Sequence, residues 1–469
     1  STYQSVGSGF ADEPTAEHNE SHERGTMSGT TYPSVNDLTL EEKASLTSGG
    51  DAWHLQGIES KGVPGYMITD GPHGLRKSLA SSTGETNLND SVPATCFPPA
   101  AGLSSSWNPE LIHKVGEAMG EECIQEKVAV ILGPGVNIKR NPLGGRCFEY
   151  WSEDPYLAGH EAVGIVAGVQ SKGVGTSLKH FAANNQETDR LRISANISQR
   201  ALREIYFPAF EYIVKTAQPW TIMCSYNRIN GVHSAQNRWL LTDVLRDEWG
   251  FKGIVMSDWG ADHDRVASLN AGLNLEMPPS YTDDQIVYAA RDGRIQPEQL
   301  DRMAQGMIDL ANKTRAAMSI DGYRFDVDAH DEVAHQAAVE SMVLLKNDDA
   351  ILPVAKDAKI AVIGEFARTP RYQGGGSSHI TPTKMTSFLD TLTARGVDAQ
   401  FAPGFTLDLE PADKALEAEA VEIAKNADVV LMFLGLPEAA ESEGFDRETL
   451  DIPAKQIELL EAVAAANKN

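Results

Sequence analysis

Several short apolar runs in this sequence end in residues that can donate protons, attack as nucleophiles or bind hydroxyl groups. These are Asp70 at the end of the run at 66–70, Lys179 and His180 after 174–178, Tyr226 after 221–225, and Asp258 after 254–256. In parallel α/β sheets the carboxyl ends of the strands meet at one edge, where reacting groups are placed. Read alone, Asp258 is explained equally well as a helix cap, and the others as packed or ion-paired groups.

The convergence of these residues favours a site for a neutral ligand rich in hydroxyl groups. Arg146 contributes a further cation, so the set contains two carboxylates, two basic side chains and a histidine. Charged groups form strong hydrogen bonds to hydroxyls, and the indole of Trp259, directly after Asp258, can stack on the apolar face of a sugar.

A second dense polar segment lies at 435–448 and contains Glu441, Glu443 and Gly444. It reads equally well as a solvated acidic loop. Alternatively, Gly444 permits a tight turn that directs the Glu443 carboxyl into a cleft between domains. Glycoside cleavage needs two carboxyl groups, which Asp258 and Glu443 would supply. We expect the cations near Asp258 to keep it ionised, and Glu443, in a less cationic loop, to hold its proton longer.

The elements that must position these residues alternate between strand-like and helix-like segments over about 250 residues. This rhythm predicts an α/β fold with a (β/α)8-type barrel, and an open doubly wound sheet is the alternative. It includes a strand-like run at 128–132, and beyond the barrel we expect helices at 332–345 and around 384–395 and strands at 359–364 and 428–433. We predict a polar tail at 1–34, the barrel at 35–318, a linker at 319–335 and an α/β sandwich domain at 336–469. The chain ends after a helix where another buried strand is expected, so the sandwich is predicted to be incomplete and the chain part of a longer protein, or completed by another chain such as a homo-oligomer partner.

Composition narrows the function classes. A net charge of −26 over 469 residues disfavours nucleic acid and anionic membranes as partners, and no apolar run is long enough to span a bilayer. The four cysteines show no paired spacing, so we expect free thiols and a cytoplasmic protein, with secretion left open because the chain starts without methionine. No motif predicts a cofactor or a metal site.

From about Leu38 to its end, the chain resembles family 3 glycoside hydrolases. The motifs that carry the resemblance are ITDGPHG at 68–74, RNPLGGRCFE at 140–149, LKHFAANNQE at 178–187, MCSYN at 223–227, VMSDWG at 255–260 and ESEGFDR at 441–447. The resemblance implies a barrel followed by an α/β sandwich, with the active site between them and net retention of anomeric configuration. Family members usually continue into more of the sandwich.

The resemblance also implies roles for individual residues. It makes Asp258 the nucleophile and Glu443 the acid/base, with Glu441 as the competitor. Ser377, or equally Ser378, matches a second-domain residue that approaches the sugar. The positions that match the family's sugar pocket are Asp70, Arg146, Lys179, His180, Met223, Tyr226 and Trp259. The AANNQ sequence at 182–186 differs from the hexosaminidase branch, which favours an acid supplied by the second domain.

These features lead us to expect an exo-acting, retaining β-glucosidase that releases glucose from the non-reducing end of β-glucosides. Asp70 at the pocket floor would prevent a sugar chain from threading past. The alternatives are a β-xylosidase or α-arabinofuranosidase of the same family, and a catalytically silent sugar-binding protein. A nucleotide-dependent enzyme is disfavoured, because neither GxGxxG nor a lysine-bearing phosphate loop is present.

Overall fold

The computed structural model describes residues 31–79 and 90–469, so almost all of the predicted tail at 1–34 lies outside the described residues. The short 3₁₀ helix η1 (Val35–Asp37) precedes α1 (Leu40–Ser45), where Thr39 and Glu42 form the reciprocal capping box that their spacing predicts. Among the described residues, no helix is both long enough and apolar enough to cross a membrane.

The first domain is built on a parallel sheet of five strands in the order β1-β2-β3-β5-β8. The strands are β1 (Met67–Asp70), β2 (Val128–Leu132), β3 (Gly175–Phe181), β5 (Thr221–Cys224) and β8 (Ile254–Ser257). Every residue of β2, β3, β5 and β8 is buried, as expected for strands covered on both faces. The parallel pairing places the carboxyl ends of all five strands at the same edge.

Single β-bridges connect the two outer strands of this sheet. Met256 of β8 bridges to Leu275, Glu276 bridges to Ser48, Gly49 bridges to Leu55, and His54 bridges back to Met67 of β1. The barrel-like (β/α) arrangement predicted from the sequence is therefore confirmed, with five regular strands and irregular bridged segments in the remainder of the ring.

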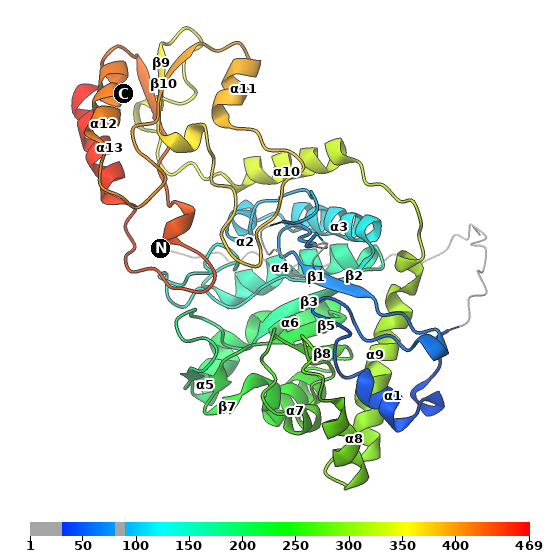
Figure 1. Cartoon of the computed structure of the whole chain (residues 1–469). Coiled ribbons are helices and arrows are strands. Elements are labelled where there is room, and N and C mark those ends of the chain that lie inside the picture. Colours follow the sequence, from blue (N-terminus) through cyan, green and yellow to red (C-terminus); the bar gives the residue numbers. More distant parts are fainter. Residues whose placement is uncertain (1–30, 80–89) are drawn as a thin grey trace, which may run out of the picture. The chain divides into compact units, whose positions relative to one another are not determined.

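Helices cover the outside of the barrel (Figure 1). The longest are α3 (Pro109–Glu126), α4 (Pro155–Ser171), α6 (Pro208–Ala217), the π-helical η6 (Trp239–Glu248) and α9 (Pro297–Met318); the shorter ones are α2 (Ala100–Leu103), α5 (Gln199–Ala201), α7 (Arg265–Ala271) and α8 (Asp283–Arg291). A small third sheet contains β4 (Ser194–Ala195), β6 (Arg228–Ile229) and β7 (Val232–His233). Asn108 and Asp154 cap α3 and α4, each followed by a proline that suits the first helical turn.

The second domain has a parallel sheet in the order β10-β9-β11, made of β9 (Ile360–Ile363), β10 (Ala399–Ala402) and β11 (Val429–Met432). Helices α12 (Lys414–Lys425) and α13 (Ala454–Ala466) lie on one side and α11 (Phe388–Ala394) on the other (Figure 1). The core around Ile363, Phe405 and Leu459 is small, and every residue of β11 is partly exposed.

Helix α10 (Val327–Ser341) leads from the barrel to this domain. This helix begins at Val327, five residues before the start expected at 332, because the Asp326 side chain accepts hydrogen bonds from the backbone N–H groups of Asp328 and Ala329. The predicted linker–sandwich boundary after 335 lies inside α10. His330 anchors α10 to α3, because its ring nitrogens lie 2.8 Å from a Glu122 oxygen and 3.1 Å from a Glu121 oxygen.

Candidate active site

A cavity of about 630 Å³ lies at the carboxyl edge of the barrel sheet. It is lined by all of the predicted sugar-pocket and catalytic residues except Glu441: Asp70, Arg146, Lys179, His180, Met223, Tyr226, Asp258, Trp259, Ser377 and Glu443. The first eight come from the barrel and the last two from loops of the second domain. The structure thus brings together residues that are up to 373 positions apart by subtraction (443 − 70).

Asp258 directly follows β8 and is 7% exposed. Its Oδ1 accepts a hydrogen bond from the Trp259 backbone N–H at 2.8 Å, which fixes the orientation of the carboxyl group. Its Oδ2 is buried without a hydrogen-bond partner among the described residues, and His180 Nε2 lies 3.7 Å away. One oxygen of Asp258 is therefore held while the other is free to react with a bound molecule.

A buried ionic network supports this side of the cavity. Glu149, 1% exposed, accepts two hydrogen bonds from Arg146 at 2.6 and 2.9 Å and lies 3.2 Å from Lys179 Nζ. Burial opposes ionisation of Glu149, but Arg146 and Lys179 outweigh it and lower the pKa of the carboxyl. Burial together with these two cations lowers the pKa of His180 well below its usual value, so this histidine is neutral.

The remaining barrel residues shape the cavity wall. Asp70, at the end of β1, pairs with Arg76 at 3.1 Å, and burial raises the pKa of Asp70 to about 6 although Lys179 and Arg76 oppose the shift. The indole of Trp259 lies 5.3 Å from that of Trp53, which gives the cavity an apolar aromatic surface. Tyr226 donates a hydrogen bond from its hydroxyl to the Trp259 carbonyl at 3.0 Å.

Two second-domain loops complete the cavity. Glu443 Oε2 accepts a hydrogen bond from the Ser377 backbone N–H at 2.7 Å, and the Glu443 N–H donates to Gly375 O at 3.2 Å. Gly444 has a φ of 100°, a conformation that favours glycine, so the tight turn expected after Glu443 is present. The loop at 441–447 and the glycine-rich loop at 373–378 therefore hold each other in place.

Glu441 lies outside this cavity. Its carboxylate pairs with Arg371 at 3.0 Å, and it lines a separate pocket together with Cys96 and Phe148. Ser378, the alternative to Ser377, is buried and does not line the active-site cavity. Of each sequence-derived pair, the geometry favours Glu443 and Ser377.

The pKa shifts of Asp258 and Glu443 run in the opposite direction to the sequence-based expectation. Burial raises the pKa of Asp258, and this effect outweighs Arg146 and the Trp259 hydrogen bond. Burial also disfavours ionised Glu443, but Arg146 at 3.5 Å, Arg190 at 2.8 Å and Ser377 overcome it and hold the pKa of Glu443 well below its usual range. The expectation that Glu443 lies in a less cationic loop was wrong because Arg190, which no sequence pattern places here, lies 2.8 Å from Glu443.

Several residues at the site were missed by sequence reasoning. They are Trp53, Arg76, Arg190, His379 and Glu438 in the cavity lining, and Glu149 behind it. Two of them carried a usable signal: Arg76 follows Asp70 by six positions and Glu149 ends one of the family-like motifs. The other four come from loops without a recognisable pattern.

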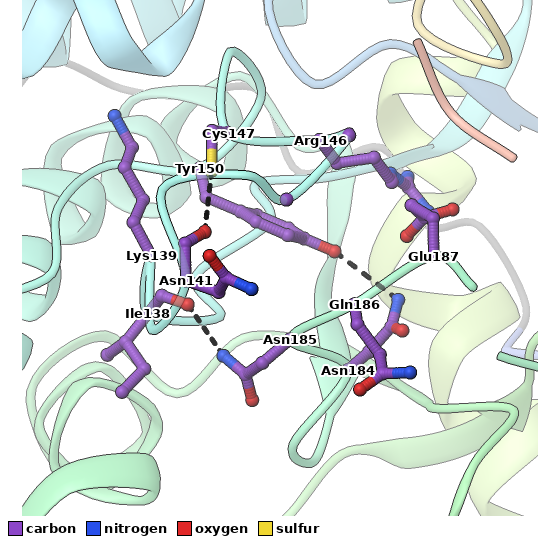
Figure 2. Close-up of a pocket in the computed structure, with 12 residues that line it drawn as sticks. Ile138, Lys139, Asn141, Arg146, Cys147, Tyr150, Asn184, Asn185, Gln186 and Glu187 are labelled. Carbon is purple, nitrogen blue, oxygen red and sulfur yellow. Dashed lines mark hydrogen bonds between the residues drawn. The ribbon is translucent and has the colours of Figure 1, made fainter. Parts of the chain in front are cut away.

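A small second pocket shares Arg146 with the main cavity (Figure 2). Figure 2 shows it enclosed by the barrel loops at 138–147 and 184–187, with the Asn184 side chain donating to the Tyr150 hydroxyl. Tyr150 in turn lies 3.0 Å from His180 Nδ1. The volume of this second pocket is about 10 Å³, which is too small for a sugar, so its residues support the site by packing.

Comparison with known proteins agrees with this geometry. The glycosyl hydrolase family 3 N-terminal domain model matches residues 77–310, and the C-terminal domain model of the same family matches 342–469. The chain is 88% identical over 452 residues to the exo-alpha-(1->6)-L-arabinopyranosidase of Bifidobacterium breve, covering 94% of this chain and 60% of that protein.

Solved structures of family 3 enzymes are also similar to this chain. A family 3 β-glucosidase of Bifidobacterium adolescentis is 90% identical with a TM-score of 0.89, covering 94% of this chain and 63% of that one. β-Glucosidase 3B of Thermotoga neapolitana in complex with glucose is 34% identical with a TM-score of 0.84, covering 92% and 66%. The chain thus spans about three fifths of the length of its first curated relatives. Its two matched domains, in order, make the chain a member of glycosyl hydrolase family 3.

Proposed function

We propose that the full-length protein is a retaining exo-glycosidase that removes one pyranose sugar from the non-reducing end of its substrate. The observation that carries the proposal is the meeting of Asp258 and Glu443, from different domains, in one cavity of about 630 Å³. Two carboxyl groups at one sugar-sized site are what glycoside cleavage requires.

In the proposed reaction the free Oδ2 of Asp258 attacks the anomeric carbon. The bond from that carbon to the leaving oxygen breaks, its electron pair goes to the oxygen, and Glu443 supplies the proton that the oxygen takes up. Water then attacks the same carbon, Glu443 accepts the proton of that water, and the sugar–Asp258 ester is released as free sugar.

The charge state of Glu443 divides these two steps. In the empty cavity Arg190 and Arg146 keep Glu443 ionised, which suits its role as the base toward water in the second step. The first step needs protonated Glu443. The pKa of Glu443 therefore has to rise when a bound substrate excludes water from the cavity.

We base the proposed exo action on the charged pair at the end of β1. Asp70 and Arg76, both buried and paired at 3.1 Å, present charged groups that suit the outer hydroxyls of a terminal sugar. The Trp53–Trp259 surface suits its apolar face. In the proposed exo mode, a terminal sugar bound by both groups ends at Asp70, and no further sugar unit extends past it.

The sugar released is proposed to be D-glucose from a β-glycosidic linkage. L-Arabinopyranose from an α-linkage is the second candidate. The first is favoured by the 90% identical β-glucosidase and the second by the 88% identical arabinopyranosidase. The two substrates present the anomeric bond in the same equatorial orientation. They differ in the orientation of the C4 hydroxyl and in the hydroxymethyl group at C5, which arabinopyranose lacks.

Four aryl glycosides with the same leaving group separate these candidates. β-D-Glucoside and β-D-xyloside share an equatorial C4 hydroxyl, β-D-galactoside and α-L-arabinopyranoside an axial one, and only the two hexosides carry the hydroxymethyl group. We expect kcat/KM to be highest for the glucoside or for the arabinopyranoside. The values for the xyloside and the galactoside then show whether the C4 hydroxyl or the hydroxymethyl group determines the preference. Tight sugar binding with no turnover of any of the four would contradict the proposal and support a silent sugar-binding protein instead.

A further inference from the structure

The loop that carries Glu443 is attached to the barrel through Asp446, a residue outside the cavity lining. The Asp446 carboxylate accepts hydrogen bonds from three backbone N–H groups: Gly145 at 3.0 Å, Glu187 at 2.9 Å and Thr188 at 2.9 Å. Burial disfavours the charged form, but these hydrogen bonds lower the pKa of Asp446, so the attachment is made by a carboxylate.

The two barrel loops that supply these N–H groups are tied to each other. Asn185 donates from its side chain to the Ile138 carbonyl at 2.6 Å, and Asn184 reaches the Tyr150 hydroxyl at 3.4 Å (Figure 2). The hydrogen-bond donors are therefore part of a platform that the barrel builds from its own residues, and Asp446 docks onto it.

Further contacts fix the loop against this platform. A side chain at Gly145 would overlap the Phe445 carbonyl oxygen, so only glycine permits this approach. The Gly444 N–H donates to Glu187 Oε2 at 3.1 Å, and the Arg447 N–H donates to the Leu143 carbonyl at 2.7 Å. The backbone is thus held on both sides of Asp446, three residues from Glu443.

We propose that Asp446 is a positioning residue for Glu443: by seating the second-domain loop on the barrel platform, it sets where the Glu443 carboxyl stands relative to Asp258. The inference rests on the proposed function, since it concerns the proton-transfer step. A displacement of about 1 Å at a reacting group can cost on the order of 100-fold in rate, so an anchor three residues away can control catalysis without touching the substrate.

The test compares kcat/KM of Asp446→Asn on two glycosides of the accepted sugar, one with a 2,4-dinitrophenyl and one with an alkyl leaving group. The variant keeps the shape of the side chain but loses the charge. Because the alkyl group depends on protonation and the dinitrophenyl group does not, we expect a loss of about 10- to 100-fold on the alkyl glycoside and less than about threefold on the other. Asp451→Asn is the matched control, since Asp451 lies shortly after this loop, is exposed, and its carboxylate accepts a hydrogen bond from the Thr449 hydroxyl at 3.1 Å.

A double variant separates positioning from general structural damage. If Asp446 acts through Glu443, adding Asp446→Asn to Glu443→Ala produces no further loss on the alkyl glycoside. Should Asp446→Asn fold poorly, Gly145→Ala disrupts the same docking from the barrel side. Gly102→Ala, in helix α2 of the barrel, is its control, because an added methyl there meets its nearest atom at 3.4 Å, an ordinary van der Waals distance.

The outcomes distinguish this inference from the proposed function. A wild-type protein that cleaves none of the glycosides rejects the proposed function itself. A wild-type protein that is active, with Asp446→Asn losing equally on both leaving groups or losing further in the Glu443→Ala background, overturns the positioning role alone.

Discussion

The two sides of the cavity are held in different ways. On the barrel side, Asp258 follows one fully buried strand and Lys179 lies in another, where it pairs with Glu149, which is 1% exposed. On the second-domain side, Glu443 and Ser377 lie on loops, and the sheet behind them has a strand, β11, that is partly exposed throughout. The barrel half is built by its own core, whereas the other half is placed by contacts to the barrel. We therefore expect the proposed nucleophile, Asp258, to keep its position without contacts from the second domain, and the proposed acid/base, Glu443, to depend on those contacts.

We expect the largest loss of activity from a substitution on the barrel side. Asp258→Ala should lower kcat on aryl glycosides by about 10³-fold or more, because the covalent step is lost. Binding of the free sugar, measured by calorimetry, reports whether the cavity persists. A loss of less than about tenfold in kcat would remove Asp258 as the nucleophile.

The buried network behind Asp258 should control stability. Glu149→Gln leaves Arg146 and Lys179 buried without their shared carboxylate, so we expect the free energy of unfolding to fall by about 3–5 kcal/mol. Denaturant unfolding measures this. Glu204→Gln, which breaks an exposed pair with Arg200, is the control and should change stability by no more than about 0.5 kcal/mol. Equal changes in the two variants would contradict the view that the barrel half is built on buried charge.

We expect the smallest effect, a pH-dependent change in stability, at α10, the helix that joins the two domains. Burial works against protonated His330, but Glu122 and Glu121 outweigh it and raise its pKa above the usual value. The stabilisation is thus fully present below about pH 6.5, the ordinary histidine value, and is lost as pH rises through the raised pKa of the folded state.

His330→Gln should therefore reduce the melting temperature more at about pH 5.5 than at about pH 9. His335→Gln on the same helix is the matched control, since His335 is 66% exposed and 3.8 Å from its acidic neighbour, and should show little pH dependence. A deficit for His330→Gln that stays the same across this range would show that the ion pairs do not hold α10 to the barrel.

The barrel half was also the half that sequence could predict. The run at 128–132 forms β2 over the same residues, and Asp258 follows β8 as expected, because strands buried on both faces leave a continuous apolar signal. In the second domain, β10 was missed since Ala399 and Gln400 carry no strand signal, and α11 starts at Phe388, four residues later than expected at 384, where Ser387 and Asp390 form a capping box.

The electrostatics of the site could not be predicted, for a related reason. Arg190 pairs with Glu443 across 253 positions of sequence, and neither residue stands in a periodic segment that reveals the contact. Glu441 and Glu443 looked alike in sequence, and only the folded loop separates the residue paired with Arg371 from the one in the cavity. Domain limits at 35–318 and 336–469, and a cytoplasmic location, stay predictions.

The measurement that tests the central claim most directly is the leaving-group dependence of kcat/KM for Glu443→Ala and Glu441→Ala in the full-length protein. If the second domain supplies the acid/base, Glu443→Ala should lose about 10²-fold or more on an alkyl glycoside and far less on the dinitrophenyl glycoside, while Glu441→Ala shows no such split. Equal losses of Glu443→Ala on both substrates, or a larger split for Glu441→Ala, would contradict the account.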